Sequence, residues 1–276
     1  MGERAQSPLA GKRVVITRAM TQSEGLFDAL RAREAEPLLF PLIRIVPLQE
    51  YEPLDAALAR LRAGDWIILT SQNAVAPVAG RGRMLRKEFF SAAEGVKVAV
   101  VGPASERAAL DANLRVDYVA NVHDGVSLAH ELGERLRGRR VLLPRSDLAS
   151  PALPAAVQKF GAEVIEVAAY HTERVREWDR RLGDTILHGA VDAVVCFSPS
   201  AVHALTDFLS TNGARADFQN TVAFVAVGAV TAQAFRDEGI HQPLVAAEAT
   251  NEAAINVLSE YFAGRRQPHF AGAKKS

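Results

Sequence analysis

Hydroxyl groups stand at two points where an apolar run gives way to a segment with helical periodicity. Ser71 and Ser198 each follow such a run, and Asn73 and Ser200 lie shortly after them. A serine in this place can cap the helix. The free backbone N–H groups of the first helical turn, aided by the helix dipole, can also bind a carboxylate. Both interpretations stay open for these two turns.

Arginine ends two further apolar runs, at Arg18 and Arg145. A guanidinium there can bind a carboxylate as a planar fork, although either residue also fits a surface loop; binding is favoured for Arg18. Two more expected helices begin with a glycine and a nearby hydroxyl residue, a pattern that suits a tight turn or close approach of a ligand to the backbone. These pairs are Gly102 with Ser105 and Gly228 with Thr231.

Tyr170 lies in the extended segment VAAYHT. A neutral phenol can donate a proton or a hydrogen bond to a departing hydroxyl group, although its ordinary pKa of about 10 makes it a weak acid. An aromatic residue that anchors a connecting segment by packing has the same appearance in a sequence. His171 would point to the opposite side of a strand, so we do not expect it to assist Tyr170.

The chain that carries these residues repeats itself. The matched segments are 11–18 with 138–145, 65–75 with 192–202, and 98–108 with 224–234. The period is too long for a solenoid, whose units have roughly 20–50 residues. We therefore predict two similar lobes with a cleft between them. Thr70 matches Phe197 across the repeat, so the two copies are not chemically equivalent.

Each copy alternates apolar, β-rich runs with segments of helical periodicity. The runs 66–70, 193–197, 96–101 and 222–227 are almost continuously apolar, which is typical of strands buried on both faces of a parallel sheet. These features predict an α/β fold with two similar parallel-sheet lobes, each doubly wound and flavodoxin- or Rossmann-like. In such folds, ligands bind beyond the carboxyl ends of the strands.

The composition excludes several classes of function. Lys plus Arg and Asp plus Glu both number 32 in 276 residues, so no basic field suggests a nucleic-acid partner. The single cysteine, Cys196, excludes an intrachain disulfide and suits a cytoplasmic location. The histidines lack a consistent metal-ligand spacing, and we predict no metal. No apolar run reaches the roughly 20 residues that span a bilayer, so we expect no membrane partner.

Several motifs together resemble those of the uroporphyrinogen-III synthase family. VVITR, TSQNAV, VAVVG, VxxYxT, FSPSAV and VAVGxxT occur within about 11–263. The resemblance implies two α/β lobes joined by a two-stranded linker, the first lobe being discontinuous. The expected bounds are 1–39 with 174–264 for lobe 1, 46–166 for lobe 2, 40–45 and 167–173 for the connectors, and 265–276 for a disordered tail.

The family cyclises hydroxymethylbilane, a linear tetrapyrrole with eight carboxylates, to uroporphyrinogen III, with loss of water and inversion of the terminal pyrrole. The resemblance implies a cofactor-free lyase of haem biosynthesis, monomeric and cytoplasmic, and favours Tyr170 as the catalytic acid. The family usually has threonine where this chain has Ser105, which keeps the hydroxyl. The expected substrate-binding residues are Arg18, Thr70, Ser71, Asn73, Gly102, Ser105, Arg145, Ser198, Ser200, Gly228 and Thr231.

Two other classes of function remain open. One is a non-catalytic, two-lobed protein that binds a tetrapyrrole or another polyanion. The other is an α/β protein that binds a sugar or a nucleotide, although the chain lacks the GxGxxG turn of dinucleotide sites.

Overall fold

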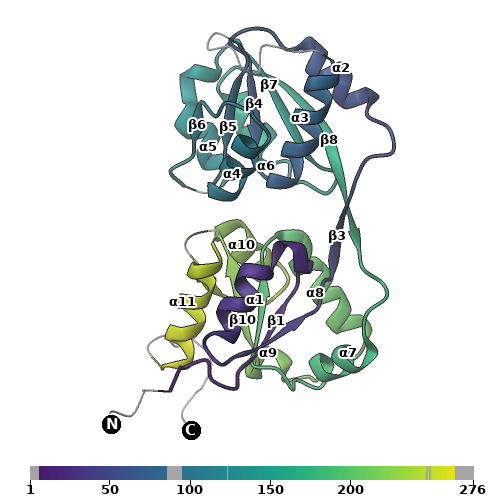
Figure 1. Ribbon diagram of the computed structural model, residues 1–276, viewed down its shortest axis with the longest axis vertical. Helices are drawn as coiled ribbons and strands as arrows, with labels where there is room; N and C mark the ends of the chain where they lie inside the picture. Colours follow the sequence, from purple (N-terminus) through teal and green to yellow (C-terminus); the bar gives the residue numbers. More distant parts are fainter. Residues whose placement is uncertain (1–5, 86–94, 123, 247, 249, 265–276) are drawn as a thin grey trace. The chain divides into compact units, whose positions relative to one another are not determined.

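The computed structural model describes residues 6–85, 95–122, 124–246, 248 and 250–264. Two compact units divide the chain: unit 1 has the described residues up to Arg44 and from Arg174 onward, and unit 2 spans Ile45–Glu173. The chain passes from one unit to the other within β3 (Ile43–Val46) and at the end of β8 (Glu163–Arg174), and these strands are hydrogen-bonded neighbours (Figure 1). The tail 265–276 lies outside the described residues.

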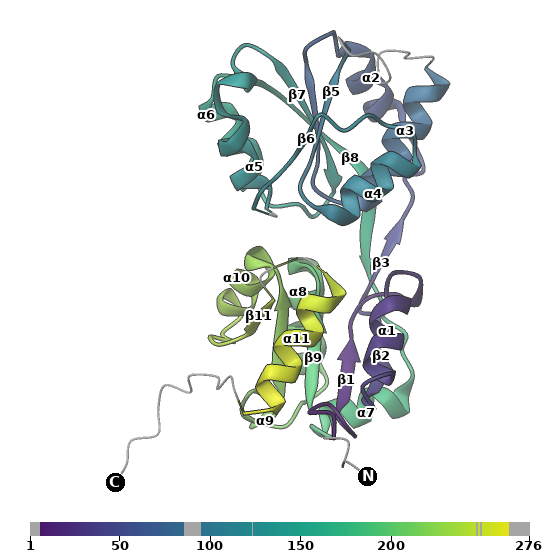
Figure 2. The same cartoon turned by 60° about the vertical axis from the view of Figure 1, so that its left-hand side comes forward.

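Unit 1 is built on a five-stranded parallel sheet. Its spatial order is β11-β10-β9-β1-β2, with the bounds Leu244–Ala246, Ala223–Val227, Ala193–Cys196, Arg13–Ile16 and Glu36–Leu39. One face is covered by α1 (Glu24–Arg31) and α11 (Asn251–Phe262), as Figure 2 shows. The other face carries α7 (Arg180–Leu187), α8 (Pro199–Thr211) and α10 (Ala229–Asp237). Short helical turns are η1 (Met20–Gln22) and α9 (Phe218–Thr221).

Unit 2 has a six-stranded sheet in the order β3-β8-β7-β4-β5-β6. The strands from β8 to β6 are parallel, and the bounds of β4 to β7 are Trp66–Leu69, Lys97–Val100, Tyr118–Val119 and Arg140–Ser146. One face is covered by α2 (Glu52–Arg60), α3 (Val75–Met84) and α4 (Pro103–Asp111). The other face carries α5 (Gly125–Leu132), η4 (Gly133–Leu136) and α6 (Ala152–Lys159), while η2 (Gln72–Ala74) precedes α3. The two mostly parallel sheets, each covered by helices on both faces, confirm the fold class predicted from the sequence.

The two units have the same strand order once the repeat is taken into account. In the repeat, β7, β8, β4, β5 and β6 correspond to β1, β2, β9, β10 and β11. The orders β2-β1-β9-β10-β11 and β8-β7-β4-β5-β6 are therefore the same flavodoxin-like arrangement, 2-1-3-4-5. Each unit takes its first two strands from one copy of the repeat and the other three from the other copy, so the copies have exchanged their opening elements.

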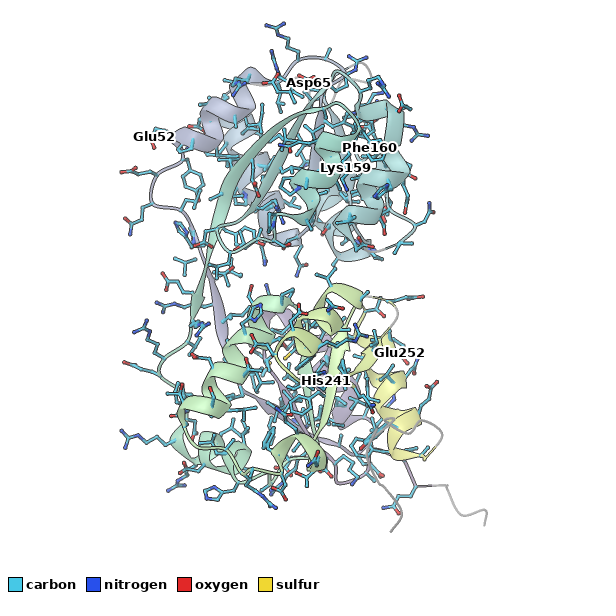
Figure 3. The ribbon with its side chains drawn as sticks, turned by 180° about the vertical axis from the view of Figure 1, so that it is seen from behind. Glu52, Asp65, Lys159, Phe160, His241 and Glu252 are labelled. Atoms are coloured by element: carbon cyan, nitrogen blue, oxygen red, sulfur yellow. The ribbon has the colours of Figure 1, made fainter. Side chains whose placement is uncertain are left out.

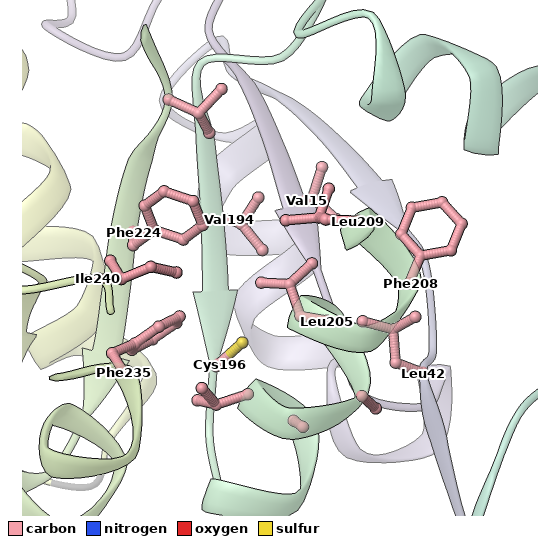
Figure 4. Packing of buried hydrophobic residues seen from close by; sticks show 14 of the residues in the cluster. Val15, Leu42, Val194, Cys196, Leu205, Phe208, Leu209, Phe224, Phe235 and Ile240 are labelled. Atoms are coloured by element: carbon pink, nitrogen blue, oxygen red, sulfur yellow. The ribbon is translucent and has the colours of Figure 1, made fainter. Parts of the chain in front are cut away.

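Each sheet is buried on both faces because successive residues of its strands point to opposite sides. In β1, Val15 packs beneath α8 and α10, with Val194 and Phe224 (Figure 4), whereas Val14 and Ile16 pack beneath α1 and α11. All three β1 side chains are fully buried. This explains why the sequence of these strands is continuously apolar rather than alternating.

Two aspartates that correspond to each other in the repeat bind backbone N–H groups at the amino ends of the strands. They connect neighbouring segments of each sheet. Asp192 accepts a hydrogen bond from the backbone N–H of Arg13 (2.8 Å) in unit 1. Its counterpart in unit 2, Asp65 (Figure 3), accepts the N–H groups of Arg140 (3.0 Å) and Arg62 (2.8 Å) and is 6% exposed. The carboxylate of Asp65 thus ties β7 to the turn before β4.

Replacing Asp65 by alanine should lower the free energy of unfolding by about 2 kcal/mol, because the backbone N–H groups of Arg62 and Arg140, at the amino ends of the strands, lose their acceptor. Urea unfolding followed by circular dichroism measures this loss. Asp237→Ala, which removes an exposed carboxylate at the end of α10, is the matched control and should cost no more than about 0.5 kcal/mol. Equal losses in the two variants would refute the structural role of Asp65.

Candidate active site

The polar residues singled out in the sequence of unit 2 lie at the carboxyl edge of its sheet. Thr70 and Ser71 follow β4, Gly102 follows β5, and Arg145 lies near the end of β7. Because the strands are parallel, these ends share one edge. The edge includes the point where the strand order reverses, between β7 and β4, which is where ligands bind in open α/β sheets.

A β-bulge directs Tyr170 toward one face of this sheet. Arg145 pairs with Ala168, but the next residue of β7, Ser146, pairs with Tyr170, so that Ala169 is an extra residue in β8. A bulge reverses the side to which the following residues point. Tyr170 therefore packs on the same face as Ala169, against the helices α2 and α3, and is only 8% exposed.

The surroundings of Tyr170 keep its phenol neutral while offering stabilisation to an anion. Burial raises the pKa of Tyr170 above its ordinary value, and the side chains of Ser71 and Asn73 and the charge of Arg145 act in the opposite direction. Ser71 also caps η2 by accepting the N–H of Asn73 (3.2 Å). Ser71 therefore caps η2 and also lies beside the phenol of Tyr170.

Asp147, which no pattern in the sequence singled out, fixes the bulged segment of β8. Its Oδ1 accepts the backbone N–H of Thr172 (3.0 Å), and its Oδ2 lies 3.0 Å from Nδ1 of His171. The hydroxyl of Ser146 contacts both Asp147 (3.1 Å) and the hydroxyl of Thr172 (2.8 Å). Although burial opposes it, these hydrogen bonds lower the pKa of Asp147. His171 is thus engaged with Asp147 rather than with Tyr170.

Arg145 is held by partners within unit 2. Its Nη1 donates to Oε1 of Glu166 (2.7 Å), its Nη2 donates to the carbonyl of Ser150 (2.7 Å), and the residue is 8% exposed. The guanidinium therefore already has a carboxylate. Glu166 was not singled out in the sequence, because its pairing with Arg145 depends on the register between β7 and β8.

The remaining predicted residues of unit 2 lie at the same edge but have structural roles as well. Thr70 packs against the first residue of α5, since a Cβ on Gly125 would lie 3.3 Å from its methyl group. Ser105 is buried in the first turn of α4. Gly102 has φ −168°, an extended conformation open to any residue, so conformational freedom does not explain a glycine there.

Unit 1 brings Arg18 to the corresponding edge, where β1 ends. Its guanidinium stacks on the ring of Phe197, with Cζ 3.6 Å from the centroid, and Nη2 donates to Oδ1 of Asn251 (2.6 Å). Burial lowers the pKa of Arg18 to about 10. Phe197 directly follows β9, and Asn251 is the first residue of α11.

The other predicted residues of unit 1 follow β9 and β10. Ser198 caps α8 through a hydrogen bond from the N–H of Ala201 (3.3 Å), and Ser200 lies in the first turn of that helix. Gly228 has φ 89°, which requires glycine at the turn into α10, and Thr231 is buried in the first turn. The structure thus places five predicted residues in unit 1 and seven in unit 2.

None of the described helices combines the length and apolar character needed to cross a membrane. In the same part of the chain, no group of three or more His, Cys, Asp or Glu side chains is placed to hold a metal ion.

Comparison with known sequences gives a family match. The model of a family described as "Uroporphyrinogen-III synthase HemD" matches residues 7–256. A uroporphyrinogen-III synthase of Synechococcus elongatus is 32% identical over 169 residues, which are 61% of this chain and 63% of that protein. The porphyrin biosynthesis protein HemD of Ruminiclostridium josui is 25% identical over 94% of this chain and 50% of its own length. The matches thus span less than two thirds of these two relatives.

Solved structures show the same fold. A mutant uroporphyrinogen III synthase of Thermus thermophilus superposes with a TM-score of 0.62 at 23% identity, over 93% of this chain and all of that chain. The uroporphyrinogen-III synthetase of Helicobacter pylori gives a TM-score of 0.54 at 14% identity, over 92% and 100%.

Proposed function

The chain belongs to the uroporphyrinogen-III synthase family, and on this premise we propose that it cyclises hydroxymethylbilane to uroporphyrinogen III. The family model covers nearly all of the described chain. The fold is that of solved synthases. The observation that carries the proposal is the buried phenol of Tyr170, which faces Ser71, Asn73 and the charge of Arg145 at the carboxyl edge of a parallel sheet.

In the proposed first step, Tyr170 donates its proton to the terminal hydroxyl of the bilane. The C–O bond breaks, water leaves, and an electrophilic azafulvenium cation forms while Tyr170 becomes a phenolate. Burial raises the pKa of Tyr170, which keeps the phenol protonated but makes it a weaker acid, so proton transfer depends on neighbours that stabilise the phenolate. The hydroxyl of Ser71, the amide of Asn73 and the charge of Arg145 then stabilise the phenolate, because all three favour the ionised form of Tyr170.

In the second step, the α-carbon of the terminal pyrrole that bears its methylene bridge attacks the azafulvenium carbon and gives a spiro intermediate. The bond from this α-carbon to the original bridge then breaks, and the released methylene carbon bonds to the free α-carbon, so that the ring closes with the terminal pyrrole inverted. The free α-carbon of the terminal pyrrole loses its proton when this last bond forms, and that proton restores the neutral phenol, so the net change is the loss of one water. No electrons pass to or from an external partner, and we propose no cofactor. Holding the bilane in the geometry for inverted closure is the larger part of the catalysis, as in other reactions accelerated by positioning.

We further propose that the hydroxyl and amide groups at the two sheet edges bind acetate and propionate groups of the substrate. In unit 1 these are Ser198, Ser200 and Thr231; in unit 2 they include Ser71, Asn73 and Ser105. Thr70, Gly102 and Gly228 shape the same edges. The proposed enzyme acts as a monomer in the cytoplasm on this small-molecule substrate.

The test is to supply the chain with freshly prepared hydroxymethylbilane and to analyse the oxidised products by chromatography. The proposal predicts that the bilane disappears faster than in a protein-free control and that uroporphyrinogen III forms. A rate equal to that of the control, with type I alone, would contradict it. Tight binding of the bilane without acceleration would instead identify a non-catalytic tetrapyrrole-binding protein.

A further inference from the structure

The exchanged repeat allows the edge of unit 1 to be compared with that of unit 2, residue by residue. Arg18 and Arg145 occupy equivalent places beyond β1 and β7. In unit 1, Ile16 pairs with Leu39. In unit 2, the equivalent Leu143 pairs with Glu166. Leu39 therefore occupies the position that a carboxylate occupies in unit 2.

This difference leaves Arg18 without the partner that Arg145 has. Glu166 lies 2.7 Å from Arg145, whereas no carboxylate of the described chain forms an ion pair with Arg18. The Nε atoms of both arginines are buried and have no hydrogen-bond partner among the described residues, so the carboxylate of Glu166 is what distinguishes Arg145 from Arg18. A buried charged donor that stays unpaired costs free energy, which an incoming anion would recover.

The residues around the two arginines have also diverged. Phe197 beneath Arg18 corresponds to Thr70, and Asn251 corresponds to Gly125. In unit 1 the guanidinium of Arg18 is stacked on the ring of Phe197, and its hydrogen bond to the side chain of Asn251 restricts its orientation. Stacking on a ring leaves the donor edges of an arginine available for a bidentate contact. Thr70 and Gly125 offer no comparable support in unit 2.

The electric field of a helix also favours an anion beside Arg18. Asn251 opens α11, a helix of 12 residues, and the positive end of its dipole lies beside the cation. Carboxylates are stabilised at helix N-termini, whereas cations are not. A guanidinium that is unpaired and placed there suits a bound carboxylate.

We propose that Arg18, held by Phe197 and Asn251, binds a carboxylate of the substrate in the position that Glu166 fills in unit 2. The identification of that carboxylate as an acetate or propionate group of a tetrapyrrole rests on the proposed function. The two copies of the repeat then have distinct roles. Unit 1 recognises substrate charge through an arginine that has no carboxylate partner within the described chain, and the charge of the arginine of unit 2 stabilises the ionised form of Tyr170.

The matched pair Leu39→Glu and Leu39→Gln tests this proposal. The glutamate reproduces the arrangement of unit 2 and neutralises Arg18 from within, whereas the glutamine has nearly the same shape without the charge. With uroporphyrin III, a stable octacarboxylate, as the probe, fluorescence titration should give a dissociation constant about 10- to 100-fold higher for Leu39→Glu than for Leu39→Gln. Thermal unfolding of both variants controls for folding.

Arg18→Gln provides a second line of evidence that does not change Leu39. It should weaken porphyrin binding to a similar degree, and adding Leu39→Glu to it should have little further effect, because the two substitutions remove the same interaction. Equal dissociation constants for the two Leu39 variants, or no porphyrin binding by the wild type, would overturn the inference. These binding measurements do not depend on turnover, so loss of the proposed activity alone would leave a porphyrin result intact.

Discussion

Replacing Tyr170 by phenylalanine should slow the formation of uroporphyrinogen III by roughly 100-fold or more, because general acid catalysis typically contributes 10²- to 10⁴-fold. The ring still fills its place against α2 and α3, so the KM for hydroxymethylbilane should change little and the loss should fall on kcat. Because unreacted bilane closes spontaneously to type I, the share of type I in the product should rise. Initial rates with separated isomers measure both effects.

The pH dependence of kcat offers a check on the same group. Burial raises the pKa of Tyr170 above its ordinary value, so the neutral phenol is the form that the fold stabilises. That stabilisation is present below the ordinary pKa of about 10 and is lost as the pH rises through the folded value. Proton donation should therefore impose no decline in kcat between about pH 7 and 9.

Tyr51→Phe is the matched control for Tyr170→Phe. Tyr51 packs against the same hydrophobic cluster of unit 2, and its loss of a hydroxyl should leave kcat within about twofold. A Tyr170→Phe variant with wild-type kcat and wild-type isomer composition would show that the phenol is not the acid. In that case the tyrosine would be a packing residue of β8.

Replacing Phe40 by alanine should lower the free energy of unfolding of unit 1 by about 3–5 kcal/mol. Phe40 is 2% exposed, and its ring centroid lies 5.0 Å from that of Phe208 and 6.3 Å from that of Trp178. This aromatic cluster joins the first segment of unit 1 to the segment that returns after unit 2. Its loss removes apolar contacts and weakens the connection between the two segments.

The measurement is urea unfolding followed by the fluorescence of Trp178 in a Trp66→Phe background, which leaves unit 1 with the reporting tryptophan. Phe27→Ala is the control, because Phe27 is only partly buried on α1, on the opposite face of the same sheet; it should cost about 1–2 kcal/mol. If Phe40→Ala cost no more than Phe27→Ala, the aromatic cluster would not be the main link between the two segments.

The sequence predicted the fold well because its signals were repeated and local. The apolar runs, the turns at Ser71 and Ser198, and the spacing of the copies all concern neighbouring residues. Aligning the two copies of the repeat also showed that Thr70 corresponds to Phe197, one of the features that distinguish the two sheet edges. The match of the family model over residues 7–256 confirms the resemblance stated from these motifs.

Other features of the site depend on contacts between distant segments. The extra residue Ala169 leaves no trace in the apolar pattern of β8, so the direction of Tyr170 was not predictable from alternation. The ion pair of Arg145 with Glu166 depends on strand register, and the contact of Arg18 with Asn251 joins residues at opposite ends of the chain. Asp147 has the appearance of a loop residue in the sequence, because the groups that bind its carboxylate, in Thr172 and His171, lie on another strand.

The isomer composition after a single turnover tests the central claim most directly. With the protein in excess over hydroxymethylbilane and the reaction quenched before spontaneous closure becomes appreciable, every product molecule has been formed on the protein. The proposed inverted closure predicts uroporphyrinogen III as essentially the sole product from the wild type. Uroporphyrinogen I as the sole product under these conditions would contradict the account.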